Sequence, residues 1–473
     1  MEKQAYDFGM IGLGTMGRNL LYNINDHGYG VSGFDKSTAQ VDTLNKESEG
    51  KKISGTSNLQ EFIDSLKQPR VIMLLVPAGK IVDSVIEEIK PHLSKADLLI
   101  DLGNSHFTDT DRRNEQLAKE NIHFMGAGVS GGESGARFGP SIMPGGDKEA
   151  YARVEEMLKA VSAKVNGEPC VTYVGSGSAG HYVKMVHNGI EYAIMQLIAE
   201  TYHILKEVGG LNNDELHQVF ATWNKGILQS FLIEITADIF LQQDDLTSNR
   251  LVDMILDAAQ QKGTGAWTSE DAMEQQVPIP AIDLAVSMRD LSSYKKQREA
   301  AEKVLKGASN ADKDSKESLI AELEQALYFA MITTYAQGLS LLYTASKKYN
   351  YGLKLDEIAA IWRGGCIIRA ALLEDIRAAY AKNPSLENIL LDEAIAAKTN
   401  QSQDGIRKII RQAVKNGIPV PVISVSLAYY DSYRRGWLPS NLLQAQRDYF
   451  GAHTYQRIDR EGIFHTHWNQ AKN

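Results

Sequence analysis

Four polar residues within one short segment have the types and spacing for acid–base chemistry. They lie at positions i, i+3, i+4 and i+7, so a helix would place all of them on one stripe. Apolar residues flank the stripe on both sides, which predicts that it lines an internal polar cavity. A salt-bridged surface stripe would fit the same spacing. The residues are Lys184, His187, Asn188 and Glu191.

A glycine-rich turn near the N-terminus predicts a dinucleotide-binding element. The apolar run 8–11 leads into a G-x-G-x-x-G turn at 12–17, and a helical pattern follows. In this arrangement the backbone approaches a pyrophosphate closely and the helix N-terminus faces it. A second short strand at 31–34 ends in Asp35, about 20 residues further on, where a ribose-binding carboxylate is expected.

The order of patterns along the chain predicts the elements that hold these residues. Apolar strands at 71–76 and 98–102 alternate with helical stretches, which is the rhythm of a parallel sheet. After about residue 177 strand patterns nearly vanish and helical periodicity continues. The fold class expected is therefore α/β, a Rossmann-type N-terminal domain followed by a large all-α domain. The expected boundaries are 1–176 for the Rossmann domain, 177–434 for the helical domain and 435–473 for a short C-terminal tail.

A weak internal repeat suggests that the helical domain is a duplicated unit. The helix at about 181–208, continued through 223–226, resembles the helix at about 318–349, continued through 362–365. The second copy lacks the lysine and glutamate of the stripe. Only the first copy is therefore expected to carry chemistry.

Composition limits the classes of function. The chain has 473 residues, 43% hydrophobic and 23% charged, as expected for a globular protein of two or more domains. A net charge of -9 without basic runs disfavours nucleic acid or an acidic membrane as a partner. We see no signal peptide and no membrane-spanning stretch. Cys170 and Cys366 have no metal or redox spacing, which favours a cytoplasmic protein without a metal site.

Four separated motifs resemble those of the 6-phosphogluconate dehydrogenases, in the same order. They are residues 129–132, 184–192, 261–265 and 447–453. The resemblance covers essentially the whole chain. It implies oxidative decarboxylation of 6-phosphogluconate to ribulose 5-phosphate with reduction of NADP, in the cytosolic pentose phosphate pathway. It also implies a homodimer in which each C-terminal tail reaches into the partner's active site.

Lys184 and Glu191 suit the acid–base steps of that reaction. Oxidation of a secondary alcohol needs a base that is neutral near pH 7, and a lysine that is desolvated and close to other cations can have its pKa lowered enough. The same lysine, once charged, can protonate the ketone oxygen during decarboxylation. The resemblance gives Glu191 the final protonation of the enediol. His187 and Asn188 are expected to orient the substrate hydroxyls.

The other substrate ligands divide into a carboxylate end and a phosphate end. The backbone amides of residues 130–132 suit a nest for the carboxylate. By resemblance, the phosphate is held by residues of both subunits, with Arg447 and His453 supplied by the tail of the other one. The substrate ligands expected are Asn104, Ser130, Gly131, Gly132, Tyr192, Lys262, Thr264, Arg289, Arg447 and His453.

The cofactor site departs from the usual pattern of the NADP-dependent members. These carry Asn-Arg-Thr or a similar triplet after the second strand and a lysine at the position of Pro77, whereas this chain has Asp35, Lys36 and Ser37. An aspartate there favours the ribose hydroxyl of NAD and repels the phosphate of NADP. We expect NADP, with NAD as the alternative, and weaker discrimination than is usual. The cofactor residues expected are Gly12, Leu13, Gly14, Thr15, Met16, Gly17, Asp35, Lys36, Ser37, Val76, Pro77 and Asn104.

Two other functions fit parts of the sequence. A β-hydroxyacid dehydrogenase of the 3-hydroxyisobutyrate type would share the Rossmann domain, the catalytic lysine and the asparagine four residues later. It would not need Glu191 or the cluster of Lys262, Arg289 and Arg447. A catalytically silent nucleotide-binding scaffold would keep the glycine turn and lose the lysine or the glutamate, and both are present.

Overall fold

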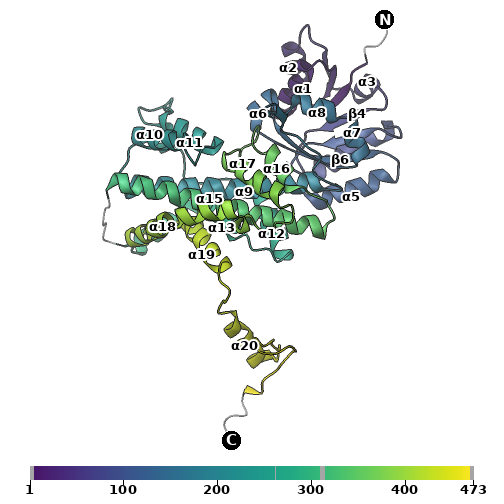
Figure 1. Cartoon of the computed structure of the whole chain (residues 1–473). Helices are drawn as coiled ribbons and strands as arrows, with labels where there is room; N and C mark the ends of the chain where they lie inside the picture. Colours follow the sequence, from purple (N-terminus) through teal and green to yellow (C-terminus); the bar gives the residue numbers. More distant parts are fainter. Residues whose placement is uncertain (1–4, 262, 309–314, 469–473) are drawn as a thin grey trace. The chain divides into compact units, whose positions relative to one another are not determined.

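The computed structural model describes residues 5–261, 263–308 and 315–468. It consists of two compact units, residues 1–426 and residues 427–473. The first unit holds both the sheet and the long helices, which Figure 1 colours from purple to green. No helix within the described ranges combines the length and the apolarity needed to cross a membrane.

The N-terminal part of the first unit is built on a seven-stranded sheet. Its strand order is β3-β2-β1-β4-β5-β6-β7, with β1 to β6 parallel and β7 antiparallel to β6. The strands are β1 (Phe8–Ile11), β2 (Val31–Phe34), β3 (Ile53–Thr56), β4 (Val71–Leu74), β5 (Leu98–Asp101), β6 (His123–Ser130) and β7 (Ser141–Gly146). The predicted Rossmann-type fold is confirmed. The strands predicted at 71–76 and 98–102 end slightly earlier, because their last residues belong to loops that line a pocket.

Helices cover both faces of this sheet. Alternate residues of each strand point to opposite faces, and two separate core clusters result. One contains Leu20 of α1 and Met157 of α8, and the other contains Phe62 of α3 and Leu117 of α5. The elements are α1 (Thr15–Asp26), α2 (Thr38–Glu47), α3 (Leu59–Asp64), α4 (Lys80–Ile89), α5 (Phe107–Ala118), α6 (Gly132–Phe138), α7 (Lys148–Ala152) and α8 (Glu155–Val161), with the hairpin β8 (Lys164–Val165) and β9 (Glu168–Pro169).

The rest of the first unit is helical and centres on two long helices. α9 (Ala179–Glu207) and α15 (Lys316–Lys348) pack against each other (Figure 1). Shorter helices follow each of them, and the duplication of this part stays a prediction. The helices are α10 (Asn213–Trp223), α11 (Phe231–Leu241), α12 (Thr264–Glu274), α13 (Pro280–Ser293), α14 (Lys295–Val304), α16 (Leu355–Ile361), α17 (Leu372–Lys382), α18 (Glu393–Asn416) and α19 (Pro421–Tyr433).

The first turn of α9 lies directly on the sheet. A Cβ atom on Gly180 would lie 2.1 Å from the carbonyl oxygen of Gly126 in β6, and a Cβ atom on Gly128 would lie 2.2 Å from the Cβ of Lys184. Only glycine permits backbones to approach this closely. The sheet therefore fixes the place of the helix that carries the polar stripe.

The second unit, residues 427–473, has a small folded centre of its own. Its helix α20 (Ser440–Gly451) carries Asp448, which is fully buried. This carboxylate accepts hydrogen bonds from the backbone N–H groups of Thr454 and Thr466 and from the indole N–H of Trp468. The bonds hold residues 454–468 against α20.

Candidate active site

The polar stripe of α9 is buried. The exposed fractions are 6% for Lys184, 0% for His187 and 8% for Asn188, and 19% for the side chain of Glu191. The neighbouring apolar residues of α9 are also buried, so the helix is covered on nearly all sides. A salt-bridged surface stripe is therefore ruled out.

Hydrogen bonds link the first three residues of the stripe, and Glu191 lies beyond hydrogen-bond distance of the histidine. The ammonium group of Lys184 donates to Oδ1 of Asn188 at 2.7 Å, and its Nζ lies 3.4 Å from Nδ1 of His187. Nε2 of His187 lies 3.3 Å from the hydroxyl oxygen of Ser130, at the end of β6. Oε2 of Glu191 lies 3.8 Å from Nδ1 of the same histidine. The histidine therefore connects the lysine, the glutamate and the sheet.

Burial shifts the pKa values of the lysine and the glutamate in opposite directions. It lowers the pKa of Lys184, although the charge of Glu191 opposes this. It raises the pKa of Glu191, although Lys184 and Arg289 oppose this. Burial, assisted by Lys184, also holds the pKa of His187 well below its ordinary value, so this ring is neutral. Nearby cations were expected to help lower the pKa of Lys184. For the described residues this prediction is wrong, because desolvation alone lowers that pKa.

The turn after β6 is the segment for which the nest is predicted. Gly131 and Gly132 both have a positive φ, +128° and +63°. A Cβ atom on Gly131 would lie 2.5 Å from the carbonyl oxygen of Gly365. A side chain at Gly131 is therefore excluded, and the adjacent Ser130 contacts His187 of the stripe through its hydroxyl.

A segment that the sequence did not reveal closes this end of the site. The ring of Trp362 packs edge-on against His187, with centroids 5.6 Å apart. The backbone N–H of Ile367 donates to the hydroxyl of Ser130 at 3.4 Å. Cys366, predicted to be a packing residue, is fully buried and donates to the carbonyl oxygen of Trp362 at 3.0 Å. The sequence feature that could have indicated this segment is the glycine pair before Cys366. This pair lies opposite the turn after β6.

The residues predicted for the phosphate end gather beside Glu191. The guanidinium of Arg289 stacks on the ring of Tyr192, 3.5 Å from its centroid. Gly265, the second residue of α12, packs so closely on Tyr192 that a Cβ atom there would lie 2.6 Å from the ring. Thr264 is the first residue of α12 and is buried. Lys262 lies outside the described residues.

The two predicted tail ligands belong to the second unit. Arg447 is exposed on α20 and donates to Gln444 at 3.1 Å. The ring of His453 packs edge-on against Phe450 at 5.9 Å.

The glycine turn after β1 has the geometry of a phosphate-binding loop. A Cβ atom on Gly12 would lie 2.4 Å from the carbonyl oxygen of Leu75, and one on Gly17 would lie 1.9 Å from the carbonyl oxygen of Gly12. α1 begins at Thr15, so Gly17 lies inside its first turn. Gly14 is the N-cap and no side chain of the described residues caps the helix there. The first N–H groups of α1 are therefore free of a capping side chain and suit an anion.

Asp35 binds the glycine turn. Its carboxylate accepts the backbone N–H of Leu13 at 2.8 Å and that of Ser37 at 2.9 Å. Lys36 forms a 2.7 Å ion pair with Glu88 of α4. The lysine that was expected to offer a charge to a ribose phosphate is thus neutralised by a carboxylate.

A cavity of about 570 Å³ lies beyond the carboxyl ends of β4 and β5. Four predicted cofactor residues line it, namely Met16, Val76, Pro77 and Asn104. Sequence reasoning missed Trp267 of α12 and His106, whose rings meet edge-on at 5.0 Å on another wall. The helical domain thus contributes an aromatic wall to the pocket of the sheet domain.

Comparison with protein families gives two matches that together span nearly the whole chain. The NAD binding domain of 6-phosphogluconate dehydrogenase matches residues 7–175, and the 6-phosphogluconate dehydrogenase C-terminal domain matches residues 180–468. The chain belongs to the 6-phosphogluconate dehydrogenase family. The resemblance noted in the four motifs is therefore confirmed.

Individual members of the family are similar over their full length. The NADP(+)-dependent, decarboxylating 6-phosphogluconate dehydrogenase of Bacillus subtilis (strain 168) is 53% identical, over 99% of this chain and 100% of its own. The decarboxylating enzyme of Escherichia coli (strain K12) is 51% identical, over 99% and 100%. The solved structure of Plasmodium falciparum 6-phosphogluconate dehydrogenase, described with NADP+ and with 6-phosphogluconate, has a TM-score of 0.94 at 45% identity, and the match covers 98% of this chain and 100% of that one.

Proposed function

We propose that this chain oxidises and decarboxylates 6-phospho-D-gluconate to D-ribulose 5-phosphate and CO2, with NADP as the hydride acceptor. The observation that carries the proposal is the buried contact of Lys184, Asn188 and His187, with Glu191 beside the stacked pair Tyr192 and Arg289. A base, an acid and a cation for a phosphate thus occur in one place. The full-length similarity to enzymes named for this reaction supports it over an unphosphorylated β-hydroxyacid substrate and over a silent scaffold.

The residues present fit a dinucleotide. The turn at 12–17 has no room for side chains at Gly12 and Gly17, and the start of α1 suits the pyrophosphate. Asp35 is placed for the ribose at the end of β2, and the cavity beside Val76 and Asn104 suits the nicotinamide. When bound, the oxidised nicotinamide supplies the acceptor for a hydride.

The first step uses the neutral form of Lys184. Its Nζ takes the proton of the hydroxyl on the carbon β to the carboxylate, while the hydrogen on that carbon leaves as hydride. The products are a β-keto acid and a charged lysine. Asn188 fixes the Nζ through its 2.7 Å hydrogen bond, and His187, being neutral, adds no competing charge.

In the second step Lys184 returns this proton to the substrate. The bond between the carboxylate carbon and its neighbour breaks, CO2 leaves, and the electron pair forms an enediol as the ketone oxygen takes the proton of Lys184. Glu191, as the carboxylic acid, then delivers a proton to the carbon that lost the carboxylate; burial, which raises its pKa, favours this form. The enediol hydroxyl returns its proton to Lys184, and the ketone product forms.

Three further expectations belong to the same proposal. We infer a homodimer in which the tail supplies Arg447 and His453 to the site of the other subunit. Several apolar side chains of the tail are exposed, among them Trp437, Leu443 and Phe450. Their exposure supports the inference that another subunit covers this segment. A cytoplasmic location and the pentose phosphate pathway fit the reaction proposed.

A spectrophotometric assay tests the proposal directly. Purified protein with 6-phosphogluconate and NADP should reduce the nicotinamide and release CO2 and ribulose 5-phosphate in equal amounts, and EDTA should leave the rate unchanged. 3-Hydroxyisobutyrate should give no turnover. Reduction of the cofactor with 3-hydroxyisobutyrate and none with 6-phosphogluconate would replace this function with the alternative one.

A further inference from the structure

Arg113 of α5 is a cation almost wholly removed from solvent, with 1% of its side chain exposed. Its Nε donates to Asp83 of α4 at 2.7 Å. Its Nη1 donates to the hydroxyl of Ser105 at 3.2 Å and lies 3.5 Å from Oδ2 of Asp101. Its Nη2 donates to the carbonyl oxygen of Gly79 at 3.0 Å. A buried guanidinium is costly unless its donors are used in this way, and here they join three separate elements.

Two of these partners belong to the loops that line the 570 Å³ cavity. Gly79 closes the loop after β4 and is the N-cap of α4, with φ at +84°. Ser105 follows the loop after β5, in which Gly103 and Asn104 line the cavity. Asp101 shapes this second loop, because it accepts the N–H of Gly103 at 2.9 Å and the hydroxyl of Ser105 at 2.5 Å. Arg113 therefore joins the two loops, through Gly79 at the first and through Ser105 and Asp101 at the second.

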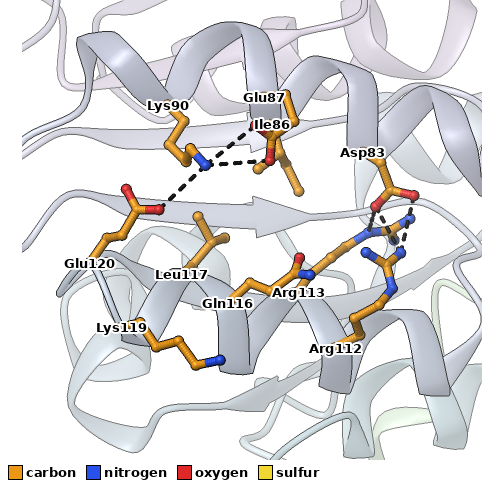
Figure 2. A pocket seen from close by; sticks show the side chains of 10 residues that line it. All are labelled: Asp83, Ile86, Glu87, Lys90, Arg112, Arg113, Gln116, Leu117, Lys119 and Glu120. Atoms are coloured by element: carbon orange, nitrogen blue, oxygen red, sulfur yellow. Dashed lines mark hydrogen bonds and ion pairs between the residues drawn. The ribbon is translucent and has the colours of Figure 1, made fainter.

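The adjacent Arg112 provides an internal comparison. Figure 2 shows both arginines converging on the carboxylate of Asp83. Arg112 donates to Asp83 at 2.9 Å and to Asp109 at 3.1 Å, but 42% of its side chain is exposed and its hydrogen bonds reach only α4 and α5. The two residues share one partner and one helix, and only Arg113 holds the loops.

We propose that Arg113 is a positioning residue for the nicotinamide end of the cofactor. The inference rests on the proposed function, because it takes the cavity as the nicotinamide pocket. Without the guanidinium, the carbonyl of Gly79 and the hydroxyl of Ser105 lose a common donor, and the two loops are no longer held at a fixed separation. The substrate residues of α9 receive no hydrogen bond from Arg113, and Asn104 is the one expected substrate ligand in the loops that it holds, so the effect falls on the cofactor first.

The test is a comparison of Arg113→Met and Arg113→Lys with the matched control Arg112→Met. KM is measured for NADP at saturating 6-phosphogluconate and for 6-phosphogluconate at saturating NADP, and the Kd of NADP is measured by fluorescence titration. We expect Arg113→Met to raise KM and Kd for NADP by about tenfold or more, with KM for 6-phosphogluconate within about twofold of wild type. For Arg113→Lys we expect KM and Kd values for NADP between those of wild type and Arg113→Met, because lysine keeps the charge but lacks the planar set of N–H donors. Arg112→Met should match wild type within about twofold.

Several outcomes would overturn the inference. Among them are a folded Arg113→Met protein with unchanged KM and Kd for NADP, and equal rises in both KM values. If Arg113→Met does not fold, Asp83→Asn is the variant to measure, since it removes the carboxylate that anchors the guanidinium on α4. We expect about a threefold rise in KM for NADP. No rise would overturn the inference. A wild-type protein that binds NADP but does not oxidise 6-phosphogluconate would contradict the proposed function alone, and the Kd values would still test Arg113.

Discussion

Nζ of Lys184 and Oδ1 of Asn188 lie 2.7 Å apart on successive turns of α9, with both side chains buried. The bond holds the ammonium group at one place in the cavity, and burial lowers its pKa. A lysine in this state can exchange a proton with a substrate near neutral pH.

Replacement of this lysine should stop the chemistry and spare the cofactor. We expect Lys184→Met to lower kcat by on the order of 10³-fold or more, because methionine carries no base to take the hydroxyl proton. The Kd of NADP should stay within about twofold. Lys206→Met is the matched control on the same helix, since Lys206 forms a surface ion pair with Asp253, and it should keep full activity. Turnover of Lys184→Met within about tenfold of wild type would refute the assignment.

Glu191→Gln should slow the release of ribulose 5-phosphate, because an amide cannot protonate the enediol. We expect a loss of about 10²-fold to 10³-fold in the rate of product formation, measured by coupled assay of ribulose 5-phosphate beside cofactor reduction. The amide keeps the size and the burial of the carboxyl, so the fold should be unchanged. Product formation at the wild-type rate would mean that Glu191 has only a structural role.

Subunit mixing tests the tail. Arg447→Ala and Lys184→Met proteins should each be nearly inactive. In their heterodimer one site carries both lesions and the other none, so random reassociation should restore roughly a quarter of wild-type activity. Heterodimers isolated by two affinity tags and found inactive would show that each tail serves its own subunit.

Cofactor preference depends on the charges at the end of β2. Asp35→Asn should shift the ratio of kcat/KM toward NADP by about tenfold or more, about 1.4 kcal/mol, because the carboxylate repels a ribose phosphate. Glu88→Gln should shift it in the same direction by releasing Lys36, and it leaves the bond between Asp35 and Leu13 intact. A wild-type preference for NADP of several orders of magnitude, unchanged in both variants, would show that Asp35 does not face the ribose.

Glu200 should make the stability of the helical domain depend on pH. This residue of α9 is buried and accepts the N–H groups of Val422 at 3.0 Å and Ile423 at 2.9 Å, in the first turn of α19. Burial raises its pKa from 4.5 to about 7, against the effect of these hydrogen bonds. Because the folded pKa lies above the unfolded one, the contribution to stability is complete below about pH 4.5 and is lost as the pH rises through about 7.

The expected loss between these limits is about 3 kcal/mol. Thermal unfolding at pH 5 and pH 8 should therefore show a smaller difference for Glu200→Gln than for wild type. Glu207→Gln, an exposed position on the same helix, is the control and should behave as wild type. Equal pH dependence in all three proteins would contradict the prediction.

Local patterns in the sequence were sufficient for the fold and for the residues of single elements. The strand, glycine turn and helix at 8–26 and the stripe on α9 depend only on residues close in the chain. Trp362, Trp267 and Arg113 come from distant segments, and only tertiary packing brings them to the site. The same limit applies to the pKa of Lys184, since burial by residues from many elements replaces the cations expected beside it.

Gly180 and Gly128 pack directly against their neighbours. This packing restricts where a member of this family can gain or lose residues. Gly180 lies on β6 and Lys184 stands four residues later on the same helix. Each residue turns an α-helix by about 100° and advances it by about 1.5 Å. An inserted or deleted residue between them would point the base away from Asn188 and Ser130, although no side chain of the site had changed. We therefore expect proteins that retain the reaction to keep the same number of residues between these two positions and to vary in length in the loops.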